Sequence, residues 1–418
     1  MRTNDNAGLV RPFAALRPAP GRAADVAAPP YDVMNGAEAR QLAAGKPWSF
    51  LHVSRAEIDL PESTSPYDPA VYAKAAENLT AMIRQGILVR DPKPCYYAYR
   101  VRMGTHSQTG IAGAGSIAAY EANRIRRHEF TRPDKEDDRV RQIEALNAQT
   151  GPVMVTHRAD STLAQILAKV VAGEPVSQVT AESGVIHTVW MIDDDADIAA
   201  INAAFDAMNA IYIADGHHRS ASASRVARAR ALASGDKGSR QPHDYFLIVS
   251  FPDDEVQILD YNRAVRDLNG HDVAGFLAAI AGAFDVEPSA RACKPDQPGR
   301  FGMYLDGRWY RLTLNQPAPP DDPVAALDIS LLSARLLGPV LAIGDPRLDK
   351  RIDFIGGIRG LAELERRVDS GEMAVAFSLF ATSLADLMAV ADANEVMPPK
   401  STWFEPKLAD GLLSLVLD

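Results

Sequence analysis

The residues best suited to chemistry stand together, in the order Asp-Gly-His-His-Arg, at positions 215 to 219. The apolar run 211–214 precedes them and an Ala- and Arg-rich stretch follows, so the pattern predicts a strand, a tight turn and a helix. In the first turn of such a helix, free backbone N–H groups and the helix dipole attract an anion. The sequence therefore predicts a phosphate-binding site made by Gly216, His217, His218, Arg219 and Ser220.

Three roles are open for Asp215, which stands immediately before the glycine. Its carboxylate can cap the helix, hold a histidine in one tautomer, or accept a proton from a substrate hydroxyl. In the last case we expect Asp215 and His218 to be catalytic residues. The alternative is an ordinary Asp-Gly turn followed by two solvated histidines. Histidine is scarce in this chain, at nine residues in 418, which favours function.

No metal-ligating residues are expected from these motifs. Neighbouring residues of a helix point about 100° apart, so His217 and His218 are badly placed to bind one ion together. Cys95 and Cys293 are far apart in the sequence and lack the spacing of zinc or iron–sulfur ligands. They also do not indicate a secreted disulfide framework, so a reducing cytoplasm is the expected location.

A second group of charged residues stands earlier in the chain and contains His128, Glu129, Arg132 and Lys135. The pattern predicts that a helix follows, with Thr131 as its N-cap. Side chains just before and within the first turn of this helix can converge on a site, where cations stabilise a transferring phosphoryl group. We expect His128, Arg132 and Lys135 to bind the cofactor and Glu129 to be a candidate catalytic carboxylate. The alternative is a solvated charged helix.

The segment 11–32 is rich in proline, which predicts an extended arm that crosses other elements. Tyr31 and Asp32 lie at its end, as residues that cover a ligand would. Asp32 is therefore a further candidate for the catalytic carboxylate, although packing alone also accounts for such an arm.

Periodicity predicts a mixed α/β fold, or α+β in the broader sense, around these motifs. The expected helices span 36–44, 68–85, 133–149, 163–171, 196–207, 220–232, 273–283, 330–337, 360–369 and 383–393. The expected strands are 48–53, the hairpin 95–103 with 109–120, then 152–156, 185–191, 211–214, the pair 245–251 with 256–259, the hairpin 301–305 with 308–314, and 411–417. A domain boundary is expected near residue 270.

Composition excludes several classes of protein. The chain has 418 residues and a formal net charge of −10, which does not favour a broad nucleic-acid surface, so no nucleic-acid partner is expected. No run approaches the roughly 20 apolar residues of a membrane span, and the N-terminus lacks the apolar core of a signal peptide. No membrane partner is expected, and the oligomeric state stays open.

Two short matches to nucleotide-binding motifs fail on context. Residues 113–118 fit the letters GxGxxA but lie inside a predicted strand of a hairpin, whereas the dinucleotide fingerprint needs a strand-to-helix turn. Residues 400–402, Lys-Ser-Thr, lack the preceding GxxxxG of a P-loop. There is also no HExxH or GxSxG motif, which excludes zincins and α/β-hydrolases.

Taken together, several separate motifs resemble the family of unknown function numbered 1015. They are Arg11-Pro12-Phe13, Ala28-Pro29-Pro30-Tyr31-Asp32-Val33, His128-Glu129 with Thr131-Arg132, Asp134-Lys135-Glu136, Ala214-Asp215-Gly216-His217-His218-Arg219 and Met397-Pro398-Pro399-Lys400-Ser401-Thr402. The Asp215–Arg219 stretch is also similar to the signature of the ParB/sulfiredoxin-like superfamily, whose free-serine kinases carry a closely similar motif. The resemblance implies a ParB/sulfiredoxin-like nucleotide-binding core with a large insertion over 1–270 and a C-terminal α/β domain over 271–418.

This resemblance implies a nucleotide-dependent phosphotransferase that acts on a hydroxyl of a small metabolite, with free serine as the leading substrate. ATP or ADP with Mg²⁺ would be the cofactors, and Asp215, Asp32 and Glu129 are the candidates for the proton acceptor. Two alternatives share the same anion site: a non-enzymatic ParB-like regulator that binds a nucleotide, and a phosphoester hydrolase. The large region between the arm and the Asp-Gly turn departs from compact members of the superfamily.

Overall fold

The computed structural model describes residues 8–234, 240–319 and 321–418. The chain divides into two compact units, one reaching to Val256 and completed by Pro406–Asp418, the other spanning Gln257–Glu405. The sequence placed a boundary near residue 270. The structural division falls earlier because β14 (Tyr261–Val265) pairs with strands of the second unit, and the chain then returns to the first unit at its C-terminus.

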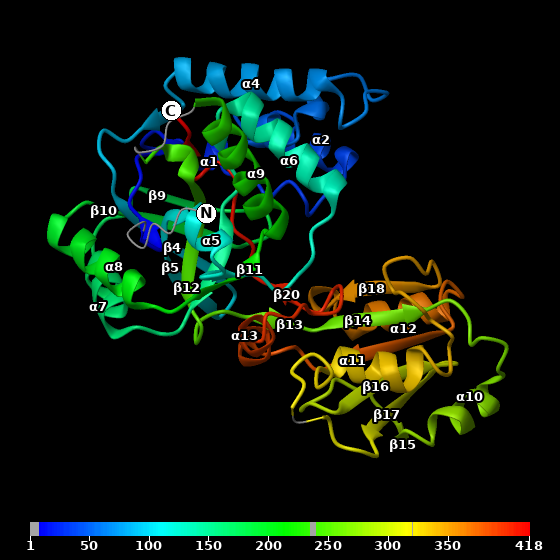
Figure 1. The fold of residues 1–418 in the computed structure, drawn as a ribbon. Helices are drawn as coiled ribbons and strands as arrows, with labels where there is room; N and C mark the ends of the chain where they lie inside the picture. The colour runs from blue at the N-terminus through cyan, green and yellow to red at the C-terminus, as the bar shows by residue number, and fades with distance from the viewer. Residues whose placement is uncertain (1–7, 235–239, 320) are drawn as a thin grey trace. The chain divides into compact units, whose positions relative to one another are not determined.

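A mixed sheet forms the centre of the first unit (Figure 1). In spatial order its strands are β6 (Ile125–Arg126), β11 (Ile211–Asp215), β8 (Val153–His157), β12 (Tyr245–Pro252), β5 (His106–Ser116), β4 (Tyr96–Met103), β10 (Ile186–Ile192) and β9 (Ser177–Thr180), with β1 (Val10–Arg11) paired to β5. The β6–β11 and β12–β8 pairs are parallel and the other pairs are antiparallel. The expected mixed α/β class is confirmed.

The predicted hairpin is confirmed as β4 and β5, but its second strand ends at Ser116 and not at Tyr120, because Ile117–Glu121 forms the helix α5 with the Ser116 side chain as its N-cap. The glycines of β5 serve packing. A Cβ atom on Gly113 would lie 2.7 Å from Val10 Cγ1, so a side chain there would push β1 away. Gly113 and Gly115 pair with β12 inside the sheet. Gly113 and Gly115 therefore lie inside a strand, as the sequence predicts, but Ile117 and Ala118 belong to the helix α5, so the prediction that all of residues 113–118 lie in a strand is wrong. The strand runs directly into the helix, without the glycine turn of a dinucleotide-binding loop.

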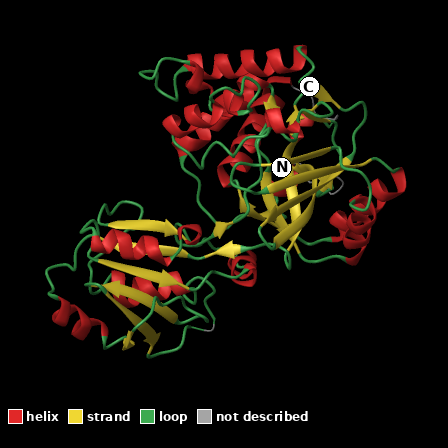
Figure 2. Ribbon diagram, turned by 180° about the vertical axis from the view of Figure 1, so that it is seen from behind, coloured by secondary structure: helices red, strands yellow, loops and turns green. Residues whose placement is uncertain are grey.

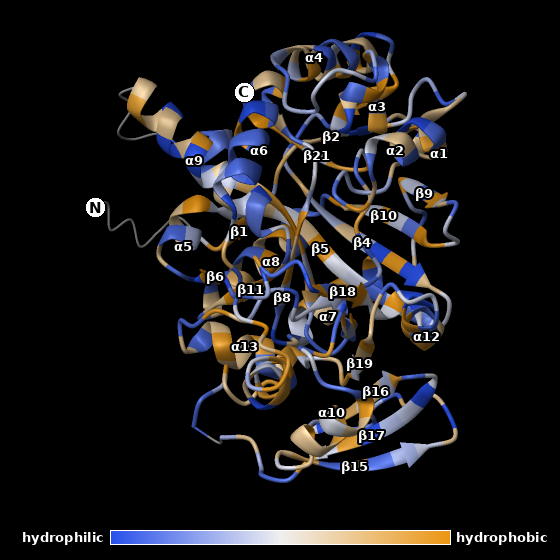
Figure 3. Ribbon diagram, turned by 90° about the vertical axis from the view of Figure 1, so that its right-hand side faces the viewer, coloured by the Kyte–Doolittle hydropathy of each residue, from blue (hydrophilic) through white to orange (hydrophobic). Residues whose placement is uncertain are grey.

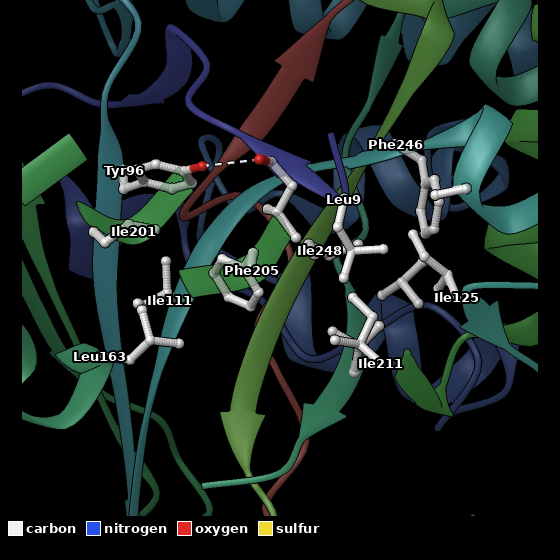
Figure 4. Close-up of a cluster of buried hydrophobic side chains, with 14 of the residues drawn as sticks. Leu9, Tyr96, Ile111, Ile125, Leu163, Ile201, Phe205, Ile211, Phe246 and Ile248 are labelled. Atoms are coloured by element: carbon white, nitrogen blue, oxygen red, sulfur yellow. Dashed lines mark hydrogen bonds between the residues drawn. The ribbon is translucent and has the colours of Figure 1, made fainter. Parts of the chain in front are cut away.

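Apolar side chains at alternating positions of the strands, on one face of this sheet, form a core cluster of the first unit together with side chains of the neighbouring helices (Figure 4). Ile111, Phe205 and Ile211 in this cluster are completely buried. Tyr96 is buried with them, and its hydroxyl donates to the Val10 carbonyl at 3.0 Å, which satisfies the polar tip and fixes the arm to the sheet.

Helices surround the sheet of the first unit. They are α1 (Ala23–Val26), α2 (Gly36–Ala43), α3 (Leu51–Ser54), α4 (Pro69–Arg84), α5 (Ile117–Glu121), α6 (Pro133–Leu146), α7 (Ser161–Val170), α8 (Asp195–Ala207) and α9 (His217–Ser234), with short 3₁₀ turns at Ala56–Asp59 and Pro242–Asp244. α6 packs against both α9 and α4. Hydrophobic and hydrophilic residues alternate along α4 (Figure 3), and its buried side comprises Val71, Tyr72, Ala75, Leu79 and Met82.

A small four-stranded sheet joins four separate parts of the first unit. Its order is β3 (Leu88–Arg90), β2 (Ala15–Pro18), β21 (Ser414–Val416) and β7 (Ala148–Gln149). β2 comes from the proline-rich arm and β21 from the C-terminal segment. The arm is extended at β1 and β2 as predicted, but the prediction is wrong at Ala23–Val26, a stretch without proline that forms the helix α1. The arm, the C-terminus and the segment after α6 are thus held together.

Other local predictions in the first unit are also wrong. The helix expected over 133–149 ends at Leu146, because Asn147 has a left-handed φ of +50°, and Ala148–Gln149 is the strand β7. The apolar run 48–53 was expected to be a strand, but Leu51–Ser54 is the helix α3, with the Val53 amide donating to the Phe50 carbonyl. A short apolar run that is buried on several sides fits either structure, so alternation cannot decide. The N-cap of α6 is Arg132 and not Thr131, because the Thr131 hydroxyl donates to the Glu136 carboxylate.

An antiparallel sheet covered by helices forms the second unit (Figure 2). Its strands, in order, are β15 (Phe284–Ser289), β17 (Arg308–Leu314), β16 (Arg300–Leu305), β19 (Val375–Leu379), β14 and β18 (Ile352–Gly356). Its helices are α10 (Val273–Ile280), α11 (Asp328–Leu332), α12 (Leu361–Asp369) and α13 (Leu384–Asp392). The π-helical turn Ser333–Leu337 follows α11, and the 3₁₀ turn Gly357–Arg359 precedes α12.

The predicted pairing of 245–251 with 256–259 is wrong. β13 (Ile258–Leu259) pairs with β20 (Trp403–Phe404), because β12 already has β5 and β8 on its two sides. In the described residues, no helix has the length and apolar character needed to cross a membrane.

Candidate functional site

Two parallel strands bring the candidate residues together. In the β6–β11 pair, Ile125 lies opposite Ile211 and Arg126 lies opposite Tyr212. Because parallel strands run in the same direction, both chains leave the sheet at the same edge, β6 toward His128 and β11 toward the Asp-Gly turn. The two charged segments of the sequence therefore meet at one place.

The turn after β11 depends on Gly216. Its φ angle is +100°, which side-chain-bearing residues rarely adopt, and a Cβ atom there would lie 3.3 Å from Val153 Cα of β8. α9 begins at His217, before the expected start of this helix at Ser220, so the two histidines lie in its first turn as the sequence predicts. The Ser220 amide donates to the Gly216 carbonyl at 3.0 Å and its hydroxyl donates to the His217 carbonyl at 3.0 Å. Ser220 is fully buried, so its side chain supports the turn and does not face a ligand.

Asp215 is an ion-paired carboxylate. Its Oδ1 accepts from Lys407 Nζ at 3.0 Å and its Oδ2 accepts from Arg219 Nη2 at 3.0 Å. Burial acts to raise the pKa of Asp215, but the charges of Lys407 and Arg219 outweigh it and hold the pKa below its ordinary value. The bonds to Lys407 and Arg219 correspond to none of the three roles left open by the sequence, and they favour a fourth role, positioning of the turn, over proton abstraction.

Arg219 links the turn to two other segments and is 9% exposed. Its Nη1 donates to the Pro152 carbonyl at the start of β8, and its Nη2 lies 3.5 Å from Asp32 Oδ2 on the arm. Burial alone would lower the pKa of Arg219, but the negative charges of Asp32 and Asp215 have the larger effect, so its pKa is raised above the ordinary value. The guanidinium is therefore charged and already bonded, and the structure brings Asp32 to the turn as predicted.

Asp410 is a residue at this site that the sequence motifs did not indicate. It is 2% exposed, and burial raises its pKa to about 7, against opposing effects of Arg219 and Arg139. Arg139 stacks over the Tyr31 ring at 3.9 Å and donates to Asp138. Asp410 and Lys407 come from the C-terminal segment, and the only local signal is that residues 409–411 repeat the Ala-Asp-Gly of residues 214–216.

His218 connects the start of α9 to the start of α6. Its Nε2 accepts from the Arg132 backbone amide at 3.1 Å. Burial lowers the pKa of His218, so the ring is neutral near pH 7 and its proton resides on Nδ1. The ring is partly exposed, which leaves it accessible at the first turn of α9.

His217 packs against His128, and both rings are buried. The ring centroids are 4.5 Å apart and the ring planes are nearly perpendicular, at 88°. His217 Nδ1 lies 3.6 Å from a carboxylate oxygen of Glu129. Burial lowers the pKa of His128 to about 4 and holds that of His217 well below its ordinary value, so both rings are neutral at pH 7.

Two predicted cofactor-binding side chains have other partners. The Arg132 guanidinium is 69% exposed and pairs with Asp134 at 2.8 Å. Lys135 donates to the Tyr67 hydroxyl at 2.8 Å. Both belong to the start of α6, close in sequence to the Arg132 amide that touches His218. They flank the turn, whereas Asp32, His128, Glu129 and residues 215–220 form it together.

Three solved structures with similarity to this chain are distant from it. A free serine kinase in complex with AMP is 14% identical with a TM-score of 0.32, covering 69% of this chain and 89% of that one. SbnI with C-terminal truncation from Staphylococcus aureus is 11% identical with a TM-score of 0.36, covering 72% and 85%. A conserved hypothetical protein from Pyrococcus furiosus is 14% identical with a TM-score of 0.32, covering 69% and 90%. TM-scores this low carry no inference about function.

The sequence predicts membership of a family, and a family model tests this. The model matches residues 10–330, which is more than half of the chain and includes the arm, the segment around His128 and the Asp-Gly turn. The motif at 397–402 lies outside the matched residues. No curated protein matches the chain. The chain belongs to the family described as "Protein of unknown function (DUF1015)".

Proposed function

We propose that this protein is a nucleotide-dependent phosphotransferase that phosphorylates a hydroxyl group of a small metabolite. The nucleotide is ATP or ADP. Free serine is the first substrate to test, because residues 215–219 are similar to the motif of free-serine kinases. The ParB/sulfiredoxin-like character of the first unit is part of the same proposal.

One observation carries the proposal: the segment before α6 lies directly on the first turn of α9. The Arg132 amide bonds His218 Nε2, and Glu129 lies beside His217. Two segments far apart in the chain therefore surround one helix N-terminus, where unpaired amides and the helix dipole favour an anion. An ordinary capping turn would not need a second segment of the chain packed against it.

The residues take distinct roles in the proposed reaction. The amides at the start of α9 and the Nδ1–H of His218 hold phosphate oxygens. Asp32 is the proton acceptor for the substrate hydroxyl, because its side chain is 44% exposed and lies against the turn through Arg219. Asp215 and Arg219 are positioning residues, since their charged groups are bonded to each other. Phosphoryl transfer requires chiefly such positioning and electrostatics.

Mg²⁺ prefers oxygen ligands and is usually bound through one or two carboxylates and the substrate phosphates. Asp215 accepts hydrogen bonds from two cations, and Asp410 is buried, so neither fits as a ligand of hydrated Mg²⁺. No step of the proposed reaction depends on a protein-held Mg²⁺ ion.

A nucleotide-binding regulator would use the same anion site without a proton acceptor. The accessible carboxylate of Asp32, 3.5 Å from Arg219, favours the enzyme over this alternative. A phosphoester hydrolase would use water in place of the metabolite hydroxyl, and the two reactions have different products.

Phosphorus NMR of the full chain with ATP or ADP, Mg²⁺ and a panel of small hydroxyl compounds, beginning with serine, tests the proposal. We expect a new phosphoester resonance that is lost in His218→Ala and kept in His271→Ala, which removes an exposed histidine of the second unit. Inorganic phosphate without phosphoester would favour the hydrolase, and no turnover of any compound would favour the regulator. Unchanged phosphoester formation in His218→Ala would reject the assigned site.

A further inference from the structure

His128, Glu129 and His217 form a compact group where β6 and β11 leave the sheet. One ligand atom from each residue lies within 4.8 Å of the other two. Two imidazole nitrogens and a carboxylate oxygen are ligands that divalent transition metals prefer. The sequence motifs did not pair His128 with His217, because the residues are far apart in the chain and only the parallel strands bring them together.

The histidines of this group are buried with ring nitrogens that lack a hydrogen bond of ordinary geometry. His128 is 2% and His217 is 4% exposed. Among the described residues, Nε2 of His217 has no hydrogen-bond partner, and the ring nitrogens of His128 make no hydrogen bond of ordinary geometry, the backbone of Ile213 interacting with that ring only outside such geometry. Native proteins rarely leave buried polar atoms unsatisfied, and a bound ion is one of the ways in which such atoms are satisfied. This observation is independent of the ligand spacing and points to the same place.

We propose that His128, His217 and Glu129 bind one divalent transition-metal ion of the zinc class. Two histidines and one carboxylate are the protein ligands of several catalytic zinc sites and of non-haem iron sites, and both kinds leave a coordination position open. Mg²⁺ and Ca²⁺ take oxygen ligands, so this group discriminates against them.

The group needs only a small adjustment to close on an ion. In a tetrahedral zinc site with bonds of about 2.0 Å, ligand atoms are about 3.3 Å apart. The present upper limit of 4.8 Å therefore shortens by up to about 1.5 Å. Glu129 can supply much of this movement, because its side chain is 45% exposed, whereas the histidine rings are held by packing.

His217 is the first residue of α9, so the ion adjoins the turn at which phosphate binding is proposed. We expect an oxygen ligand, from water or a phosphate, at the open position. Only this expectation rests on the proposed function. Metal binding itself is measured without a nucleotide.

Titration of the EDTA-treated full chain with Co²⁺ tests the site, because Co²⁺ replaces Zn²⁺ in such ligand sets and absorbs visible light when bound. We expect one Co²⁺ per chain, displaced by Zn²⁺ and not by Mg²⁺. Glu129→Gln lowers the Co²⁺ affinity at least tenfold, and His128→Phe abolishes binding. The controls Glu62→Gln and His271→Ala, which alter exposed residues elsewhere, bind as wild type.

Two results would overturn the proposal: no binding of Co²⁺ or Zn²⁺ by the wild-type chain, or unchanged affinity in both Glu129→Gln and His128→Phe. Glu129→Gln keeps the test valid even if the buried His128→Phe variant does not fold, since the Glu129 side chain is half exposed. Nucleotide binding without added metal is measured on the same samples, so failure of the metal site and failure of the phosphotransferase are distinguishable.

Discussion

At the scale of single residues, burial and pairing sort the charged groups of the site into different roles. Asp215 bonds Lys407 and Arg219 and is held ionised. Asp32 touches only the edge of this network and is exposed to solvent. A proton acceptor needs access to its substrate, so in the proposed reaction accessibility favours Asp32 over Asp215.

Asp32→Asn should lower kcat for phosphotransfer about 100-fold or more, because the amide cannot accept the hydroxyl proton. The KM for the nucleotide should stay nearly unchanged, since the α9 amides and His218 are untouched. Steady-state kinetics separate the two constants, with Asp306→Asn in an exposed turn of the second unit as the control. If instead the KM for the nucleotide rose by a similar factor while kcat stayed unchanged, Asp32 would serve nucleotide binding and not proton transfer.

The buried carboxyl group of Asp410 makes the stability of the first unit depend on pH. Its pKa is raised by burial to about 7 in the folded chain, above the ordinary 3.8. The folded state therefore binds the proton on Asp410 more tightly than the unfolded state does. Protonation of Asp410 adds to the free energy of unfolding at low pH, and this stabilisation is lost as the pH rises through about 7. The limiting size is on the order of 4 kcal/mol.

Asp410→Asn keeps the neutral form at every pH. In thermal unfolding, the Tm of the variant relative to the Tm of the wild type should be higher at pH 8 than at pH 5. A difference in Tm between variant and wild type that is the same at both pH values would contradict the raised pKa.

At the scale of elements, the sequence predicts well where a pattern is local and poorly where a partner is remote. The strand, glycine turn and helix at 211–234 follow from apolar periodicity and the Asp-Gly pair, and they are confirmed. β6 has only two residues inside a charged run, so no periodicity marks it. Without β6, the contact between His128 and His217 could not be predicted.

Gly216→Ala tests the turn as an element. Gly216 and the control Gly184 both have positive φ angles, so alanine costs about 1–3 kcal/mol in backbone strain at either position. Only at Gly216 does the new Cβ meet the β8 backbone, whereas it meets nothing within 4 Å at Gly184. Thermal unfolding should therefore show a larger loss for Gly216→Ala, and equal losses would mean that β8 moves aside.

At the scale of the whole molecule, the first unit is closed by the C-terminal residues. β21 pairs with β2 and β7, and Lys407 bonds Asp215. No local sequence signal joins residues 406–418 to a unit that otherwise ends at Val256. The sequence therefore predicts two domains but not that the chain returns, since such pairing is set by packing between distant segments.

Two fragments of the chain should behave in opposite ways. Residues 257–405 have their own buried cluster and their own sheet, so this fragment should unfold cooperatively in circular dichroism. Residues 1–256 lack β21, Lys407 and Asp410 and should not fold cooperatively unless 406–418 is supplied. A cooperative transition of residues 1–256 alone would contradict the closing role of the C-terminus.

The central claim is that the first turn of α9 binds nucleotide phosphates, and isothermal titration calorimetry with ADP and ATP tests it most directly. We predict saturable binding of one nucleotide by the wild-type chain, unchanged in His271→Ala and weakened at least tenfold in His218→Ala, which loses a donor to the phosphates. No binding by the wild-type chain, or equal affinity in His218→Ala, would contradict it.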